Sequence, residues 1–231
     1  MPQSRHPSSR RRPEEKKEAE DVFVDKTMEV VRWSKANTQI ILLGAIVVVV
    51  LFAGILYYRS HRASVLEQAV AQLEEVQSAV AFGERESAKI QLNQYLDRFE
   101  GTVYALEARL MLGQVLLEEG NMNEAIEVLA PAVQAMEKQP LGVQAAFLMA
   151  AAYEEADRKE DAERLFLRIA RTADMSFQVR EALSGAARLR TQAGNLNGAA
   201  QLFEEILGTL EEGDPDRSYW EMRLAEVSYR P

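Results

Sequence analysis

One pattern of residues recurs four times along the chain, each time 37 positions further on. Each unit has a turn residue, and an alanine and two larger packing residues follow it after 5, 9 and 12 positions. The agreement of four registers over four units excludes chance, and a period of this length indicates a repeat architecture. The four sets are Gly83, Gly120, Asp157 and Gly194; Ala88, Ala125, Ala162 and Ala199; Leu92, Leu129, Phe166 and Phe203; and Tyr95, Ala132, Ile169 and Ile206.

Each unit reads as two amphipathic helices joined by a tight turn. The second unit is the clearest, with helices predicted over 106–119 and 123–136. Gly120 can adopt the left-handed conformation that ends a helix, and Asn123 is expected to cap the next one. Ala125 is expected to be small because the two helices cross closely there.

This pattern resembles the tetratricopeptide repeat, which implies an all-α solenoid of about four helix pairs. The departures are Asp157 at a turn, Tyr95 at a small packing position, and a period of 37 where roughly 34 is usual. We expect the additional residues to lengthen the connections at 136–140 and 172–176. The resemblance is carried by Leu112, Gly113, Leu116, Gly120, Ala125, Leu129 and Ala132, by Tyr153, Ala162, Phe166 and Ile169, and by Gly194, Ala199, Phe203 and Ile206.

A final single helix is predicted over 217–229, one repeat interval beyond Arg180. Its apolar stripe of Trp220, Leu224 and Val227 would cover the open end of the stack, since terminal repeats need a cap.

The stretch Thr38–Tyr58 contains no charged residue, and from Ile40 onward every residue is apolar, counting Gly and Tyr. As a helix, this run would be roughly 28 Å long, close to the hydrocarbon thickness of a bilayer. A cleaved signal peptide and a buried core helix are the alternatives. The first would have a shorter apolar run after a shorter leader, and the second would have a polar face. We therefore predict one transmembrane helix.

Basic residues indicate the orientation of this span. Lys26, Arg32 and Lys35 precede it closely, whereas only Arg59 and Arg62 follow before Arg85. The positive-inside rule then places the N-terminus in the cytoplasm and the C-terminal domain across the inner (cytoplasmic) membrane. We divide the chain into a disordered cytoplasmic tail (1–20), a juxtamembrane amphipathic segment (21–37), the transmembrane helix (38–58) and an extracytoplasmic repeat domain (59–231).

Taken together, these parts are similar to the YfgM-like family of ancillary SecYEG translocon subunits, whose repeat domain is shared with the cell-division coordinator CpoB. The resemblance implies a single-pass membrane protein that sits beside the translocon and hands emerging chains to extracytoplasmic chaperones. Its partners would be translocon subunits, chaperones or client segments. The alternative is a tetratricopeptide scaffold for envelope assembly or cell division that is unrelated to secretion.

The residues that support enzyme chemistry are missing from the sequence. It has no Cys, and its two histidines, His6 and His61, lack the spacing of a catalytic triad or a zinc motif. Adjacent glutamates point about 100° apart on a helix, so a solvated surface explains them better than acid/base pairs do. We expect no enzyme activity, cofactor, metal or small-molecule substrate. The net charge of −9 also argues against nucleic acid.

The concave face of the stack, built from the first helix of each unit, is the expected protein-binding surface. Repeat domains that clamp a terminal carboxylate use Lys, Asn and Arg there, whereas Leu110 and Phe147 stand at those positions. We predict no such clamp and favour an amphipathic or basic ligand; alternatively, these two residues only pack against the next unit. The expected lining is Glu107, Leu110, Gln114, Leu117, Gln144, Phe147, Glu154, Glu181 and Arg188.

The predicted orientation can be tested by protease access in spheroplasts. External protease should digest the segment 106–231 while the N-terminal tail stays protected, because only the C-terminal domain would face outward. Digestion after membrane permeabilisation serves as the control. Protection of 106–231 in intact spheroplasts would reverse the proposed topology.

Overall fold

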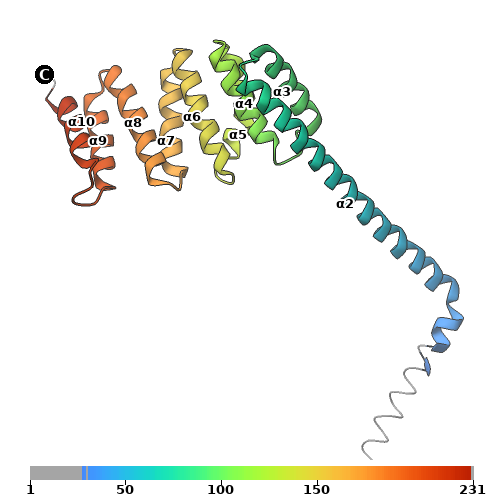
Figure 1. Cartoon of the computed structure of the whole chain (residues 1–231). Helices are drawn as coiled ribbons and strands as arrows, with labels where there is room; N and C mark the ends of the chain where they lie inside the picture. The colour runs from blue at the N-terminus through green and yellow to red at the C-terminus, as the bar shows by residue number, and fades with distance from the viewer. Residues whose placement is uncertain (1–27, 30, 230–231) are drawn as a thin grey trace, which may run out of the picture. The chain divides into compact units, whose positions relative to one another are not determined.

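The computed structural model describes residues 28–29 and 31–229, and every regular element in those ranges is a helix. The predicted tail (1–20) lies outside the described residues, as does part of the juxtamembrane segment (21–37). The chain divides into two compact units with the boundary between Ala63 and Ser64. The helices are α2 (Thr38–Ala81), α3 (Arg85–Phe99), α4 (Ala105–Glu118), α5 (Met122–Gln134), α6 (Pro140–Glu155), α7 (Lys159–Thr172), α8 (Ser176–Gln192), α9 (Leu196–Gly208) and α10 (Arg217–Ser228) (Figure 1).

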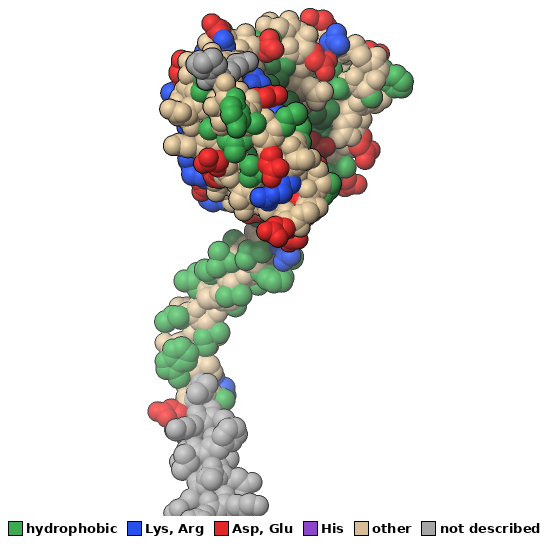
Figure 2. Space-filling model, turned by 90° about the vertical axis from the view of Figure 1, so that its left-hand side faces the viewer, with side chains coloured by type: hydrophobic (Ala, Val, Ile, Leu, Met, Phe, Trp, Pro, Cys, Tyr) green, Lys and Arg blue, Asp and Glu red, His purple; other side chains and the backbone are tan. Residues whose placement is uncertain are grey.

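The described part of the first unit is helical. Residues 31–36 form a helical segment that ends in a turn at Asn37, whose side-chain amide donates to the Trp33 carbonyl at 2.9 Å. Next comes α2, whose apolar stretch Ile40–Tyr58 is solvent-exposed throughout (Figure 2). Of the described helices, α2 is the one long and apolar enough to cross a membrane.

The second compact unit, residues 64–231, is the repeat domain and forms a stack of antiparallel helix pairs. The last part of α2 pairs with α3: the two share the hydrophobic core, and the Arg98 guanidinium on α3 donates to the Gln68 side-chain oxygen on α2 at 2.7 Å. The following pairs are α4 with α5, α6 with α7, and α8 with α9. From α3 onward, helices that follow one another in sequence pack together, and α4 also contacts α6. This nearest-neighbour stacking is the expected tetratricopeptide-like solenoid, so the predicted fold class is confirmed.

The turns within the pairs adopt the predicted left-handed conformation. The φ angles are +76° at Gly83, +81° at Gly120, +56° at Asp157 and +78° at Gly194. Asp157 is the one described non-glycine residue with a positive φ. Asp157 therefore adopts the left-handed backbone conformation because of its position in the repeat, and not because of the conformational preference of aspartate.

The predicted cap at Asn123 is wrong, because α5 begins one residue earlier than expected and Asn121 occupies the N-cap position. Asn121 makes no capping hydrogen bond through its side chain. In the fourth unit the equivalent residue, Asn195, does cap its helix: its Oδ1 accepts from the Gly198 backbone N–H at 3.0 Å. Capping at this register position thus varies from unit to unit.

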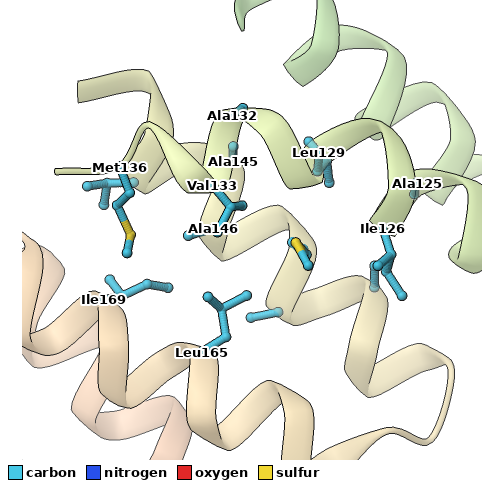
Figure 3. Close-up of a cluster of buried hydrophobic side chains, with 14 of the residues drawn as sticks. Ala125, Ile126, Leu129, Ala132, Val133, Met136, Ala145, Ala146, Leu165 and Ile169 are labelled. Atoms are coloured by element: carbon cyan, nitrogen blue, oxygen red, sulfur yellow. The ribbon is translucent and has the colours of Figure 1, made fainter. Parts of the chain in front are cut away.

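Small residues allow the paired helices to approach closely, as predicted. The alanine five positions after each turn is fully buried in all four units. Gly142 is still more confined, because a Cβ there would lie 2.5 Å from the Met136 Cα. Figure 3 shows part of the resulting core, in which side chains of α5, of the turn that follows it, of α6 and of α7 meet: Ala125, Ile126, Leu129, Ala132, Val133, Met136, Ala145, Ala146, Leu165 and Ile169.

The final helix, α10, covers the last pair as predicted. Val227 is buried, and Trp220 and Leu224 are partly buried against the core. The Trp220 ring lies 6.3 Å from the ring of Phe203 on α9, centroid to centroid. The inner face of α10 therefore serves as a cap for the repeat array.

We predict that Asp157→Gly stabilises the repeat domain (64–231). The left-handed conformation destabilises a residue that has a Cβ by about 1–2 kcal/mol. Glycine avoids this cost, but part of the gain is lost because glycine also increases the conformational entropy of the unfolded chain. The ion pair of Asp157 with Lys159 is highly exposed, so its loss should matter little. Chemical denaturation in detergent, followed by circular dichroism, should show a gain of about 0.5–1 kcal/mol.

The reciprocal change Gly194→Asp is the matched control, and it should lower stability by about 1 kcal/mol. A loss of stability in Asp157→Gly would contradict the interpretation that this turn is strained.

Candidate functional site

The candidate site is a groove of about 530 Å³ on the first helices of the second, third and fourth units. Six of the nine predicted residues line it: Glu107, Leu110, Gln114, Gln144, Phe147 and Glu181. The remaining lining comes from the same three helices, α4, α6 and α8: Met111, Leu141, Leu148, Phe177 and Gln178.

The groove combines apolar side chains with an acidic and amide rim. Leu110, Phe147 and Leu148 are partly buried and pack against the hydrophobic core. Two glutamates and three glutamines form the polar part of the lining, and none of the described side chains that form the groove is Lys or Arg. A groove of this composition favours a ligand that presents apolar and basic groups.

The two acids differ in their hydrogen bonding. The carboxylate of Glu107 accepts from the Gln77 side-chain amide at 2.9 Å, so Gln77 holds it in place. Glu181 is exposed and has no side-chain partner among the described residues. Glu181 is therefore the acid more available to a ligand.

Three predicted residues lie outside this groove. Leu117 packs partly buried against the core. Glu154 on α6 and Arg188 on α8 form a two-pronged ion pair, with both nitrogen-to-oxygen distances 2.7 Å. The hydrogen bonds that the Arg188 guanidinium donates to the Glu154 carboxylate raise the pKa of Arg188. These two charges satisfy each other and link consecutive units.

Phe177 was not among the expected residues, although it lines the groove and is 55% exposed. It sits in the first turn of α8, one helical turn before Glu181, so the two share a face. This i, i+4 relation to a residue already assigned to the surface was the available signal.

Phe147 also has a structural contact, because its ring lies 6.2 Å from the ring of Phe166 on α7, centroid to centroid. This contact is with the second helix of the same repeat unit, so it does not decide whether Phe147 and Leu110 pack against the next unit; both side chains do pack against the hydrophobic core. Since both side chains also line the groove, packing and surface roles coexist. Whether the groove binds protein stays a prediction.

The described residues offer little support for other chemistry. They contain no group of three His, Cys, Asp or Glu side chains that could hold a metal ion. Structural contacts also account for the other shifted pKa values. The hydrogen bond from Lys89 to Glu119 raises the pKa of the Lys89 ammonium, and burial raises the pKa of the Tyr95 phenol.

The sequence pattern of the tetratricopeptide repeat-like domain matches residues 31–229. The chain belongs to this family. A comparison with curated protein sequences found no match. Tetratricopeptide-like repeat proteins are generally non-catalytic scaffolds, and their fold implies interaction with other proteins.

Solved structures share the tetratricopeptide fold at low sequence identity. A tetratricopeptide repeat protein from Parabacteroides merdae is 19% identical, with a TM-score of 0.57 over 69% of this chain and 60% of that protein. MamA from Desulfovibrio magneticus RS-1 is 14% identical, with a TM-score of 0.52 over 69% and 83% of the two chains. Our chain thus matches only three-fifths of the Parabacteroides merdae protein, and these likenesses establish the fold alone.

We predict that replacing the two groove phenylalanines, Phe147 and Phe177, by alanine changes the stability of the protein to different extents. Phe147→Ala should destabilise the repeat domain (64–231) by about 1–3 kcal/mol, because the contact of this ring with Phe166 is lost. The loss should be smaller than for a fully buried phenylalanine, because Phe147 is only partly buried. Phe177→Ala should change stability by no more than about 0.5 kcal/mol, because its side chain is mostly exposed. Denaturation of both variants in detergent measures the difference. Equal losses would contradict the assignment of Phe177 to the surface.

Proposed function

We propose that this protein is a membrane-anchored scaffold that docks other proteins in the groove formed by α4, α6 and α8. The supporting observation is the lining of that groove, in which exposed Phe177 and partly buried Phe147 lie among acids and glutamines. The family supports protein binding as the general role.

The favoured ligand is an extended or helical segment that carries apolar side chains next to Lys or Arg. Its apolar groups would contact Leu110, Phe147 and Phe177, and its basic group would meet Glu181. A terminal carboxylate clamp is not proposed, because a carboxylate would meet acids there and no basic partner in the described lining.

The anchor in this proposal is the stretch Thr38–Tyr58, with the N-terminus in the cytoplasm and the repeat domain (59–231) outside. The apolar composition and the exposure of this part of α2 support a lipid environment. The greater number of Lys and Arg residues before the span supports the orientation.

We further propose a place beside the protein translocon, where the groove would receive emerging chains and pass them to extracytoplasmic chaperones. The support is the resemblance in architecture: a short N-terminus, one span and a degenerate repeat array. A scaffold for envelope assembly or cell division is the competing assignment.

Photo-crosslinking in native membranes tests this proposal. A photo-reactive amino acid at Gln144, which is exposed in the groove, should crosslink to translocon subunits or to chains in transit. The matched control is Glu127, which is exposed on the second helix α5, outside the groove. Phe177→Ala should lower the yield at Gln144 severalfold, because it removes an apolar side chain that the ligand would contact while leaving the acids of the groove unchanged.

The possible outcomes separate the parts of the proposal. Crosslinks from Gln144 only to division or envelope-assembly proteins would contradict translocon association while retaining the scaffold. Equal crosslinking at Gln144 and Glu127 would contradict the groove as the docking site.

A further inference from the structure

The outer face of α7 carries an arginine stripe, formed by Arg164, Arg168 and Arg171. These residues are spaced by four and three positions, so on a helix they lie within about 60° of one another. On the opposite side of α7, Leu165 and Ile169 point into the core (Figure 3). Arg164 and Arg171 are exposed, and Arg168 is partly exposed. The stripe therefore faces away from the core of the stack.

The arginine stripe is peculiar to the third repeat unit. The corresponding positions of the other second helices, α3, α5 and α9, hold no Lys or Arg. Residues 64–231 as a whole hold 16 Lys and Arg against 29 Asp and Glu. Neither the repeat pattern nor the composition of the domain therefore accounts for the stripe. The corresponding residues are Ile90, Gln94 and Asp97; Glu127, Pro131 and Gln134; and Gln201, Glu205 and Gly208.

The stability of α7 does not account for the stripe either. Like charges three or four residues apart on a helix repel each other and weaken it. Arg164 is paired with Asp161, whereas Arg168 and Arg171 form no ion pair within the described residues. The helix dipole favours a base in the last turn, which explains Arg171 alone. A stripe that weakens its own helix indicates a surface kept for a ligand of opposite charge.

A pocket of about 540 Å³ opens at the end of the stripe, and Arg171 lines it. The buried side chains of Met136 and Val143 and the exposed side chain of Met175 supply apolar lining. The charged lining is balanced, with two basic residues against two acidic ones. The pocket therefore suits an apolar side chain, whereas the stripe suits acids.

Acids on both sides of α7 limit the width of the ligand. Exposed glutamates lie on the neighbouring second helices, Glu124 and Glu127 on α5 and Glu204 and Glu205 on α9. A bilayer or a nucleic-acid duplex would cover these acids together with the stripe and would be repelled by them. A single helix that lies along α7 would contact chiefly the stripe.

We propose that the arginine stripe and the adjoining pocket dock an acidic helical segment of another protein. The segment would run antiparallel to α7, which places the positive end of its dipole beside the negative C-terminal end of α7. Acids at its positions i, i+3 and i+7 would meet Arg171, Arg168 and Arg164 in turn, because both helices rise by the same distance per residue. An apolar residue one turn before the first acid would enter the pocket.

This docking surface differs from the groove formed by α4, α6 and α8. No residue of the stripe lines that groove, and only Gln178 lines both the groove and the pocket. The two surfaces also favour ligands of opposite charge. One scaffold could therefore hold a basic segment and an acidic one at the same time.

A designed peptide tests the proposal on the full chain in detergent. The labelled peptide is a helix rich in Ala and Gln, with leucine at i−4 and glutamates at i, i+3 and i+7, and fluorescence anisotropy at low salt measures its binding. Arg168→Gln combined with Arg171→Gln should weaken binding about 5- to 30-fold, because two exposed ion pairs are lost. The matched control, Arg85→Gln with Lys159→Gln, removes two charges at exposed positions outside the stripe and should leave binding nearly unchanged.

The pocket is tested by combining a change in the peptide with one in the protein. Replacement of the peptide leucine by alanine should weaken binding, and so should Met175→Gln. Together the two changes should cost less than the sum of their separate effects, because both remove the same contact. Full additivity would overturn the assignment of the pocket to this apolar residue.

Three results would overturn the proposal as a whole. The first is that the peptide does not bind, or binds no better than a peptide of the same composition with its glutamates on different faces of the helix. The second is that the stripe variant and its control weaken binding equally. The third is that inorganic polyphosphate competes as well as the unlabelled peptide, which would make the stripe a site for anions in general. Circular dichroism should show an unchanged fold, since the substitutions are at the surface.

Discussion

Close packing between paired helices is the interaction on which the repeat domain (64–231) depends. In each pair an alanine with no exposed surface sits where the helices cross, and each helix contacts chiefly its neighbours in sequence. A stack of this kind is stabilised by a sum of local interfaces. An error at one crossing therefore weakens one or two interfaces and leaves the more distant ones intact.

The first pair has the same crossing alanine, Ala88, but differs at the packing position seven residues later. Where the later units place Ala132, Ile169 or Ile206, it has Tyr95, whose fully buried ring lies 4.9 Å from that of Phe99, centroid to centroid. The close contact of the two rings adds aromatic packing to the burial of this pair.

The features predictable from sequence were those determined within one unit. A left-handed turn and a close crossing each restrict a single position, so Gly83, Gly120 and Gly194 and the alanines after them identified the fold. Longer-range detail was less accessible. The pairing of Glu154 with Arg188 joins different units 34 residues apart, whereas the tetratricopeptide resemblance placed each of them separately on the concave face. The cap at Asn123 failed because a one-residue shift of a helix start changes which side chain reaches the free N–H groups.

The glycines that face packed neighbours differ in how freely they can change during evolution. A Cβ at Gly113 or Gly185 would meet the side chain of Leu129 or Phe166, which a second substitution could shorten. At Gly142 the obstacle is the backbone of Met136 and Ala132, which no change of side chain removes. Sequence drift can therefore rewrite most of the core in correlated pairs of substitutions, while position 142 is held at glycine for as long as α5 and α6 keep their connection.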